Sequence, residues 1–354
     1  MEQNAIEREK RRKQLERKRR KRRKYIIQRG AMIGVGLICV GLGYKLIMGL
    51  FSKPNEAQEV VQMDQAKNQE SSQLENSALT EEGKKVEEGK VALSREDLGK
   101  GKLVVVNNNY PLRIYDESEL VVIAEENGGA YQVKNKTVKL NKEAVIALND
   151  MLEDFKKEQG SHALNIVSGY RDFNEQERIH YETLVAQGQE HTNQYVAKPD
   201  RSEHHTGLAV DFGIYYSDGT SKEYDGTGIY SWINENAYKY GFVLRYAEEK
   251  KEKTGISYEP WHFRYVGKVH AGIMTELNLC LEEYITYLKN YSYYTSPGQG
   301  ITDSAKNYSI YYVPAENDIT YVPVPTSKPY IISGNNIDGF IVTVELNKEV
   351  SKES

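Results

Sequence analysis

Two adjacent histidines, an aspartate and a third histidine are spaced along this sequence in a way that suits a catalytic metal ion. His204 and His205 stand a short turn before Asp211, and His262 follows Glu259 by three residues. Catalytic zinc commonly takes three nitrogen or oxygen ligands from the protein and keeps a fourth position for water. One of the adjacent histidines, Asp211 and His262 would meet that count, and Glu259 would reach the water without being a ligand.

These residues need a particular local fold to come together. Asp211 lies in the apolar segment LAVDFG, which is typical of a short strand with side chains on alternate faces. A turn just before the strand would bring His204 or His205 back beside Asp211, and the spacing does not choose between them. His262 would arrive from another strand. Because histidine–aspartate pairs are also common as ordinary hydrogen bonds, the spacing alone leaves both interpretations open.

The same segments resemble two motifs, S-x-H-x-x-G-x-A-x-D and E-x-W-H, of zinc D-alanyl-D-alanine carboxypeptidases of the VanY-like family. The first motif matches residues 202–211 and the second matches residues 259–262, while SGYR at 168–171 and YGFVLRY at 240–246 match further family sequence. The resemblance covers roughly residues 103–289, with every motif position filled in order. It implies a small α+β domain of the hedgehog/DD-peptidase type.

The resemblance also chooses between the two adjacent histidines. Family members carry histidine at the position of His204 and usually glutamine or another residue at the position of His205. The implied ligands of the zinc ion (Zn²⁺) are therefore His204, Asp211 and His262.

Catalytic and binding roles follow from the resemblance as well. Glu259 is implied as the group that takes a proton from water and passes it to the leaving amine. Arg171 is implied as the fixed cation that stabilises negative charge on the substrate oxygen, although without the motif a surface ion pair would explain it equally. Four further positions are expected to contact substrate or line its pocket, and these are Ser202, Gln176, Tyr170 and Trp261. Packing alone would also explain Tyr170 and Trp261.

Other polar residues near the motifs have open or ordinary interpretations. Arg245 and Arg264 lie in strand-like segments, where each could bind a terminal carboxylate or be structural. The remaining histidines lack partners at ligand spacing and are expected at the surface; they are His162, His180, His191 and His270.

The expected reaction is hydrolysis of the terminal D-Ala of peptidoglycan stem peptides. The same site would serve an LD-carboxypeptidase or a crosslink endopeptidase, and a non-catalytic wall-binding module is a third interpretation. The presence of Glu259 beside three ligands argues against the third, since binding alone does not need a carboxylate placed at a water molecule. Stem peptides are the expected partner, and neither nucleic acid nor a protein partner is implied.

The N-terminal part of the chain differs sharply from the rest. Residues 1–30 contain 14 Lys and Arg against four Glu, whereas the remainder carries 33 bases against 47 acids. Residues 31–51 are apolar apart from Lys45. Because about 20 apolar residues span a bilayer as a helix, we expect a transmembrane helix at 31–51. The basic tail before this stretch predicts a cytoplasmic N-terminus and an extracellular catalytic domain. A cleaved signal peptide is the alternative, but it would have a shorter apolar region and a small-residue cleavage site, and neither is evident here.

Composition and periodicity predict the rest of the organisation. The expected parts are a flexible polar linker at 52–100, a carboxypeptidase domain at 103–290 and a β-rich extension at 291–354. The fold class is α+β, with a central antiparallel sheet and flanking helices. Strands are expected at 103–108, 164–168, 242–246 and 262–266, and helices are expected after the candidate N-cap Asn141, at 174–186, at 230–240 and from about 267 to 289.

Overall fold

The computed structural model describes residues 88–128, 131–160, 163–216, 218–294, 300–302 and 307–347. The predicted basic tail at 1–30, the transmembrane helix at 31–51 and the linker as far as residue 87 lie outside these residues. In the part that is described, no helix is long and apolar enough to cross a membrane.

A mixed sheet of six described strands positions the site. Its order is β3-β5-β6-β9-β8, with β7 paired to β6 at one end. The strands are β3 Gln132–Val133, β5 Leu164–Ser168, β6 Ala209–Tyr215, β7 Ser221–Glu223, β8 Phe242–Leu244 and β9 His262–Tyr265. Every pair is antiparallel except β3 with β5. The mixed α and β character is confirmed, and so are the strands predicted at 164–168, 242–246 and 262–266.

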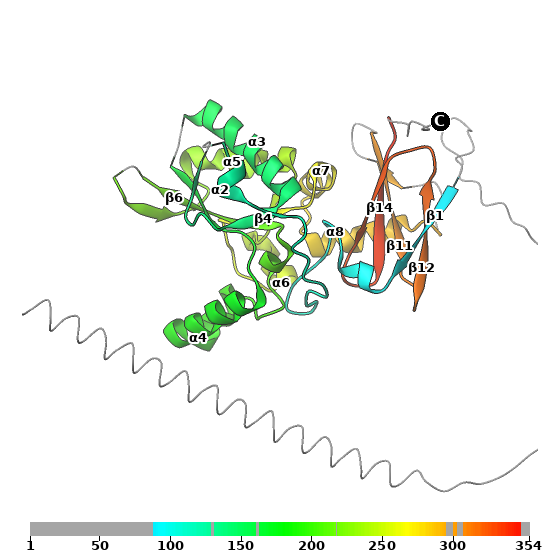
Figure 1. Cartoon of the computed structure of the whole chain (residues 1–354), viewed down its shortest axis with the longest axis horizontal. Coiled ribbons are helices and arrows are strands. Elements are labelled where there is room, and N and C mark those ends of the chain that lie inside the picture. The colour runs from blue at the N-terminus through cyan, green and yellow to red at the C-terminus, as the bar shows by residue number, and fades with distance from the viewer. Residues whose placement is uncertain are drawn as a thin grey trace, which may run out of the picture. The chain divides into compact units, whose positions relative to one another are not determined.

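Helix α3, Lys142–Gln159, covers the sheet with its apolar face (Figure 1). It begins after Asn141, whose side chain accepts hydrogen bonds from two backbone amides of the first turn, and it ends at Gly160 in the left-handed conformation. Such caps satisfy backbone groups that have no partner inside the helix. The buried stripe includes Leu148, Leu152 and Phe155, which join the core of the sheet. Short elements precede it, namely β2 Leu120–Val122, α2 Ile123–Glu126 and β4 Lys139–Asn141.

The other predicted helices are present with different bounds. Helix α4, Phe173–Tyr195, is longer than expected because a second helical segment follows a kink at Gly188, whose backbone is not helical. The helix predicted at 230–240 is divided into η3 Gly228–Tyr230, α5 Ser231–Asn236 and η4 Ala237–Tyr240. It ends at Gly241, whose φ of 92° is a conformation that glycine adopts without strain.

The last predicted helix is two helices. They are α7, Lys268–Glu276, and α8, Leu281–Leu288, followed by η6, Lys289–Tyr291. Asn278 between them has a φ of 50°, and asparagine is one of the few residues that tolerate this left-handed conformation. The chain therefore turns at Asn278 before α8 begins. The short helices η5, Glu248–Lys250, and α6, Lys251–Thr254, lie earlier in the chain.

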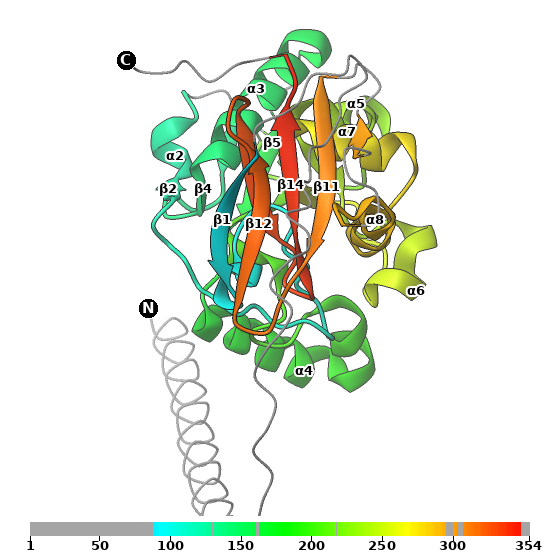
Figure 2. The same ribbon diagram turned by 90° about the vertical axis from the view of Figure 1, so that its right-hand side faces the viewer.

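The strands predicted near the C-terminus form a second sheet in the order β10-β11-β14-β13. They are β10 Ile301–Thr302, β11 Tyr308–Pro314, β13 Tyr330–Gly334 and β14 Gly339–Glu345, and β12 Ile319–Pro325 pairs instead with β1 Glu88–Ser94. Figure 2 shows β1 lying along β12 beside the strands of this sheet. Val322 and Val324 of β12 pack with Phe340 and Val342 of β14.

Strand β1 and the following η1, Glu96–Gly99, correct the linker prediction. The linker was expected to run to residue 100, but residues 88–99 are ordered elements. The polar composition of the surrounding stretch conceals the alternating Val91 and Leu93, which pack against the buried core of the second sheet. An alternation of two apolar residues is too short to stand out in a window dominated by charge.

The strand predicted at 103–108 is wrong, although its apolar side chains are buried. Leu103 and Val105 join a core with α7, α8 and the second sheet. Their backbone is held by side chains and turns instead of a strand partner. Arg264 donates to the carbonyls of Lys102 and Val104, both at 3.0 Å, and the Leu103 amide donates to Ser333 Oγ.

Candidate active site

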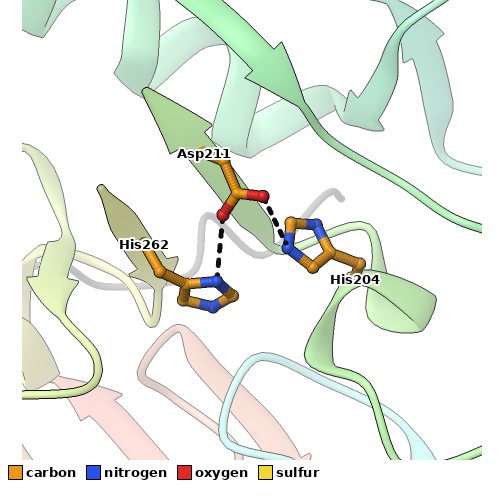
Figure 3. A group of neighbouring side chains, drawn as sticks. All are labelled: His204, Asp211 and His262. Atoms are coloured by element: carbon orange, nitrogen blue, oxygen red, sulfur yellow. Dashed lines mark ion pairs between the residues drawn. The ribbon is translucent and has the colours of Figure 1, made fainter. Parts of the chain in front are cut away.

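The structure brings His204, Asp211 and His262 together from three elements. His204 lies in η2, Glu203–Thr206, while Asp211 lies in β6 and His262 opens β9. One potential ligand atom from each residue lies within 4.8 Å of the others, and all three residues are buried. Figure 3 shows each imidazole ring next to one oxygen of the Asp211 carboxylate.

The backbone explains this convergence. Asp211 and His262 are direct partners in the antiparallel register of β6 and β9, so their side chains rise from the same place on the sheet. His204 returns to that place because η2 ends at Gly207 with a φ of 67°, a left-handed turn before the strand. A residue with a Cβ would be strained at this position.

Hydrogen bonding sets the tautomer of His204. Its Nδ1 lies 2.6 Å from the Gly169 carbonyl, so Nδ1 carries the proton, and its Nε2 faces Asp211 Oδ2 at 3.2 Å. Burial lowers the pKa of His204 to about 4, so the ring is neutral at physiological pH. A neutral ring binds a metal through its unprotonated nitrogen, while a carbonyl accepts the proton of the other nitrogen and fixes the ring.

His262 presents its other nitrogen to the same aspartate. Its Nδ1 lies 3.0 Å from Asp211 Oδ1, and its ring packs against Tyr246 with 4.8 Å between the ring centroids and 45° between the planes. Burial alone would lower the pKa of His262, but the carboxylates of Asp211 and Glu203 raise it to about 9. A metal ion arriving here must therefore displace a proton from the ring.

Glu259 lies next to the group without belonging to it. Its Oε2 is 3.8 Å from Nδ1 of His262, and only 6% of the residue is exposed. Burial raises the pKa of Glu259 to about 7. A carboxyl that titrates near neutral pH can both accept and return a proton, as a general base that later acts as an acid must.

Arg171 reaches the same aspartate from the segment after β5. Its Nη2 lies 2.7 Å from Asp211 Oδ2, while Nε donates to Ser168 Oγ and Nη1 donates to Gln176 Oε1. Burial would raise the pKa of Asp211, but His204, His262 and Arg171 hold it well below its ordinary value.

Gln176 is buried and hydrogen-bonded at both ends of its amide. It is 1% exposed, its oxygen accepts from Arg171, and its Nε2 donates to the Ala197 carbonyl at 2.7 Å. Gln176 therefore orients Arg171, and its expected contact with substrate stays a prediction.

The other three expected contacts lie near the site in different environments. Ser202 is buried immediately before η2. The hydroxyl of Tyr170 donates to Glu117 at 3.0 Å. Trp261 is partly buried against the core of the central sheet, and its carbonyl accepts from the Phe212 amide. Their roles toward substrate stay predictions.

His205 lies outside the group of three and supports the loops around it. Its Nδ1 is 2.7 Å from the Arg171 carbonyl, and its Nε2 accepts from the Asp200 amide at 3.2 Å. The ring also packs on Tyr115. His205 therefore joins the backbone that carries Arg171 to the loop before η2.

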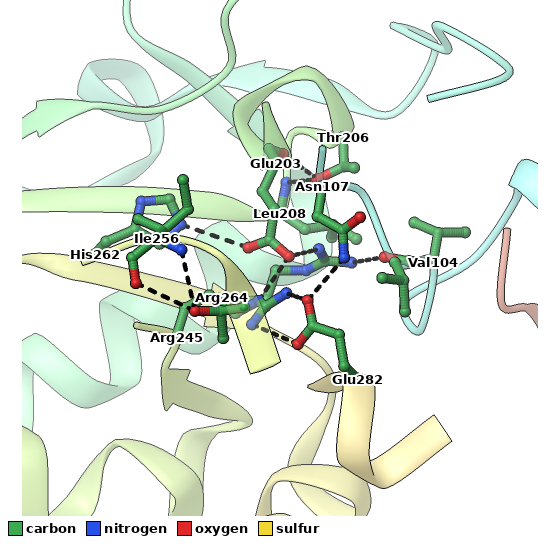
Figure 4. Close-up of polar contacts among 12 residues, drawn as sticks. Val104, Asn107, Glu203, Thr206, Leu208, Arg245, Ile256, His262, Arg264 and Glu282 are labelled. Carbon is green, nitrogen blue, oxygen red and sulfur yellow. Dashed lines mark hydrogen bonds and ion pairs between the residues drawn. The ribbon is translucent and has the colours of Figure 1, made fainter. Parts of the chain in front are cut away.

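A buried charge network behind His262 was not predicted as a unit. Arg245 and Arg264 are at most 1% exposed and both donate to Oε1 of Glu203, at 2.8 and 2.9 Å, so they are structural (Figure 4). Arg245 also donates to both carboxylate oxygens of Glu282 on α8. The sequence placed Arg245 and Arg264 in strand-like segments and Glu203 inside the histidine motif, but it did not indicate that the three residues pair.

His270 corrects the expectation of a surface histidine. It is 8% exposed, its Nδ1 lies 2.8 Å from the Tyr284 hydroxyl, and its Nε2 lies 3.0 Å from Thr343 Oγ1. The polar sequence around it did not reveal that α7 is covered by α8 and by β14.

The group of three fits a divalent cation on chemical grounds. Asp211 Oδ1 is buried without a hydrogen bond to any described residue, although a histidine nitrogen lies 3.0 Å away. Two imidazoles and a carboxylate that converge in this way need a cation between their lone pairs, and this donor set suits zinc. A mixed α and β fold that holds such a group beside a carboxyl titrating near neutral pH defines a metal-dependent hydrolase.

Comparisons with known proteins give the family. Residues 137–268 match the family model described as VanY, D-alanyl-D-alanine carboxypeptidase. A D-alanyl-D-alanine carboxypeptidase of Enterococcus faecium is 37% identical over 312 residues, which cover 87% of this chain and 93% of that protein. The bifunctional D-Ala-D-Ala dipeptidase and D-Ala-D-Ala carboxypeptidase VanXYC of Enterococcus gallinarum is 34% identical, over 52% of this chain and 94% of that protein.

A solved structure agrees with these relatives. The vancomycin resistance D,D-dipeptidase VanXYg, in complex with a D-Ala-D-Ala phosphinate analog, superposes with a TM-score of 0.65 at 36% identity, over 73% of this chain and 99% of that one. The chain belongs to the VanY family of D-alanyl-D-alanine carboxypeptidases. It is accordingly a zinc-dependent hydrolase.

Proposed function

We propose that this enzyme removes the terminal D-Ala of peptidoglycan stem peptides at the site formed by His204, Asp211, His262, Glu259 and Arg171. The observation that carries the proposal is the placement of Glu259 Oε2 at 3.8 Å from Nδ1 of His262, with its pKa raised to about 7 by burial. The VanXYg structure supports the substrate class, because that relative is bound to an analog of D-Ala-D-Ala.

The zinc ligands in this proposal are His204, Asp211 and His262. When bound, zinc makes a water molecule acidic and polarises the carbonyl of the scissile bond. The protein prepares for this by keeping His204 neutral through burial, by fixing its proton on Nδ1 against the Gly169 carbonyl, and by holding Asp211 and His262 in register on two strands.

Glu259 moves the proton in this proposal. Its Oε2 accepts a proton from the attacking water and later donates it to the amine of the leaving D-Ala. A solvent-exposed glutamate would be too weak a base at neutral pH, whereas burial brings the pKa of Glu259 to about 7.

Arg171 supplies fixed positive charge. Its guanidinium is held by Ser168 and Gln176 and lies 2.7 Å from Asp211. A cation that is already oriented stabilises the negative charge that develops on the substrate oxygen, without having to reorganise during the reaction. The ion pair to Asp211 keeps this cation within reach of the reacting atoms.

Defined peptides test the specificity. The purified enzyme with zinc is incubated separately with a pentapeptide ending in D-Ala-D-Ala, with a tetrapeptide ending in a single D-Ala, and with a crosslinked dimer. We expect loss of one D-Ala from the pentapeptide, measured by mass, and no reaction after zinc is chelated. Cleavage of the tetrapeptide alone would indicate an LD-carboxypeptidase, and separation of the dimer would indicate an endopeptidase.

We also propose that a helix at 31–51 anchors the enzyme, with the catalytic part outside the cytoplasmic membrane. The support is the apolar composition of this stretch and the basic tail before it. Washing membranes of producing cells with alkaline carbonate should leave the full chain in the membrane fraction, and protease added to intact protoplasts should digest the catalytic part. Release by carbonate would contradict the anchor, and protection from protease would contradict the orientation.

A further inference from the structure

We propose that Glu203 is a positioning residue for the zinc ligand His262, fixing its tautomer so that Nδ1 is free for the metal. The inference rests on the proposed function, because it takes His262 as a ligand. It goes further by giving the buried carboxylate behind the site a task in metal binding that neither the motif nor the ligand geometry assigns.

The two oxygens of Glu203 have separate surroundings. Oε1 accepts from Arg245 Nε at 2.8 Å and from Arg264 Nη1 at 2.9 Å. Oε2 faces Nε2 of His262 at 3.5 Å, and among the described residues neither of these two atoms has a hydrogen-bond partner. Figure 4 shows the carboxylate lying between the His262 ring and the two guanidinium groups.

Burial makes this arrangement consequential. The side chain of Glu203 is fully buried, and that of His262 is 4% exposed. An unpaired carboxylate oxygen and an unpaired ring nitrogen at this depth are each costly, and a proton on Nε2 satisfies both. Both arginines donate to Oε1, so Oε2 is left to accept from the ring of His262.

The two histidine ligands consequently have opposite tautomers. His204 carries its proton on Nδ1, which faces the Gly169 carbonyl, and offers Nε2 to the metal. His262 carries its proton on Nε2, which faces Glu203, and offers Nδ1 beside Asp211. A carboxylate that accepts from the distal nitrogen orients the ring and makes the ligand more basic, and losing such a partner typically weakens metal binding by about 10- to 100-fold.

Glu282 provides a matched control within the same network. Its oxygens accept from Arg245 at 2.6 and 2.9 Å and from Asn107, so it neutralises the same arginine without facing His262. The substitutions Glu203→Gln and Glu282→Gln each remove one negative charge from the network. In Glu203→Gln the amide oxygen stays with the donors of Arg245 and Arg264, so an NH2 group replaces the acceptor behind the ligand.

The experiment measures the zinc affinity of the purified full-length chain by competition with a chromophoric chelator. We expect Glu203→Gln to weaken zinc binding by about 10- to 100-fold and Glu282→Gln to change it by less than about threefold. Thermal unfolding of the zinc-free proteins reports any shared loss of stability. Equal zinc affinity of Glu203→Gln and wild type, or equal weakening by both substitutions, would overturn the inference.

The tautomers provide a second measurement that needs no variant to fold. Two-bond proton–nitrogen spectra of the zinc-bound wild-type chain, with isotope-labelled histidine, should show one metal-bound ring protonated at Nδ1 and one protonated at Nε2. Two rings protonated at the same nitrogen would overturn the inference. Failure of the wild-type chain to bind zinc would instead overturn the proposed function, so the two failures are distinguishable.

Discussion

At the scale of single residues, Glu259 has an environment that separates metal binding from chemistry. Its carboxyl lies beside His262 but is not one of the three groups placed to bind the metal. Glu259→Gln keeps the size of the side chain and removes the base, so we expect zinc content to stay at the wild-type level. Turnover of a D-Ala-D-Ala peptide should fall by about 100- to 10,000-fold.

The matching control is His262→Ala, which should lose zinc and activity together. Zinc is measured by metal analysis of the purified protein and turnover by release of D-Ala. Wild-type turnover by the Glu259→Gln enzyme would remove Glu259 from the mechanism, whereas loss of zinc from this variant would make it a ligand.

His205 leads to a second prediction at this scale. Its ring donates to the Arg171 carbonyl and accepts from the Asp200 amide. A glutamine amide also has one donor group and one acceptor, so His205→Gln should keep kcat/KM within about threefold of wild type. His205→Leu has neither, and leaving two buried backbone groups unpaired costs about 1–3 kcal/mol each.

We therefore expect His205→Leu to lower kcat at least tenfold through misplacement of Arg171, with zinc affinity unchanged. Peptide kinetics of the two variants, together with zinc titration, check this. Equal loss by both variants, or loss of zinc, would show that the imidazole itself acts at the site.

The sequence predicted which residues form the site better than it predicted the contacts that hold them in place. The donor types and their spacing indicated a metal, and the family resemblance chose His204 over His205. Neither revealed that Gln176 orients Arg171, although the two are close in the chain, or that Glu203 faces His262 from a distant segment. The second contact depends on strand register, which short apolar runs specify only once they pair.

At the scale of elements, the helix with clear caps was predicted well, whereas strand β1 was missed and the segment at 103–106 was wrongly expected to be a strand. Asn141 and Gly160 mark the ends of α3 by local chemistry, which acts within one turn. Strand β1 had no such signal because its partner, β12, lies more than two hundred residues away. The segment at 103–106 looked like a strand because it is apolar, but Arg264 donates to the carbonyl of Val104 and to that of the preceding Lys102.

Strand β1 gives the prediction at this scale. Val91 faces the core of the second sheet opposite Val322, whereas the neighbouring Lys90 is exposed. Placing a charge in that core should cost about 2–3 kcal/mol, and the same charge on the outer face should cost less than about 0.5 kcal/mol. Chemical unfolding of Val91→Asp and Lys90→Asp in the full chain compares them. Equal stability of the two variants would mean that β1 does not pack as described.

At the scale of the whole described part, α7 and α8 connect the catalytic sheet to the second sheet. Val243 of β8, Met274 of α7, Leu281 of α8, Ile310 of β11 and Ile341 of β14 belong to a single buried cluster. Because this cluster is continuous, we expect the site and the second sheet to unfold together. No composition pattern predicted the connection, since the residues that form it are spread from β8 to β14.

His270 lies where these elements meet and should make their junction sensitive to acid. It bonds Tyr284 of α8 and Thr343 of β14, and burial, with a smaller effect of Lys102, lowers its pKa from 6.5 to about 3. Above pH 6.5 the ring is neutral in both the folded and the unfolded chain. Between these two pKa values only the unfolded chain binds the proton, so the free energy of unfolding falls as the pH falls, by up to about 1.4 kcal/mol per pH unit.

His270→Gln should remove this contribution while keeping hydrogen-bonding groups at the junction. We expect the variant to be less stable than wild type at neutral pH and to lose stability more slowly as the solution is acidified from about pH 6.5. Denaturant unfolding of both proteins at a series of pH values gives the two slopes, and all other titrating groups contribute equally to each. Parallel slopes would mean that His270 binds its proton as readily in the folded chain as in the unfolded one, and would contradict the lowering of its pKa by burial.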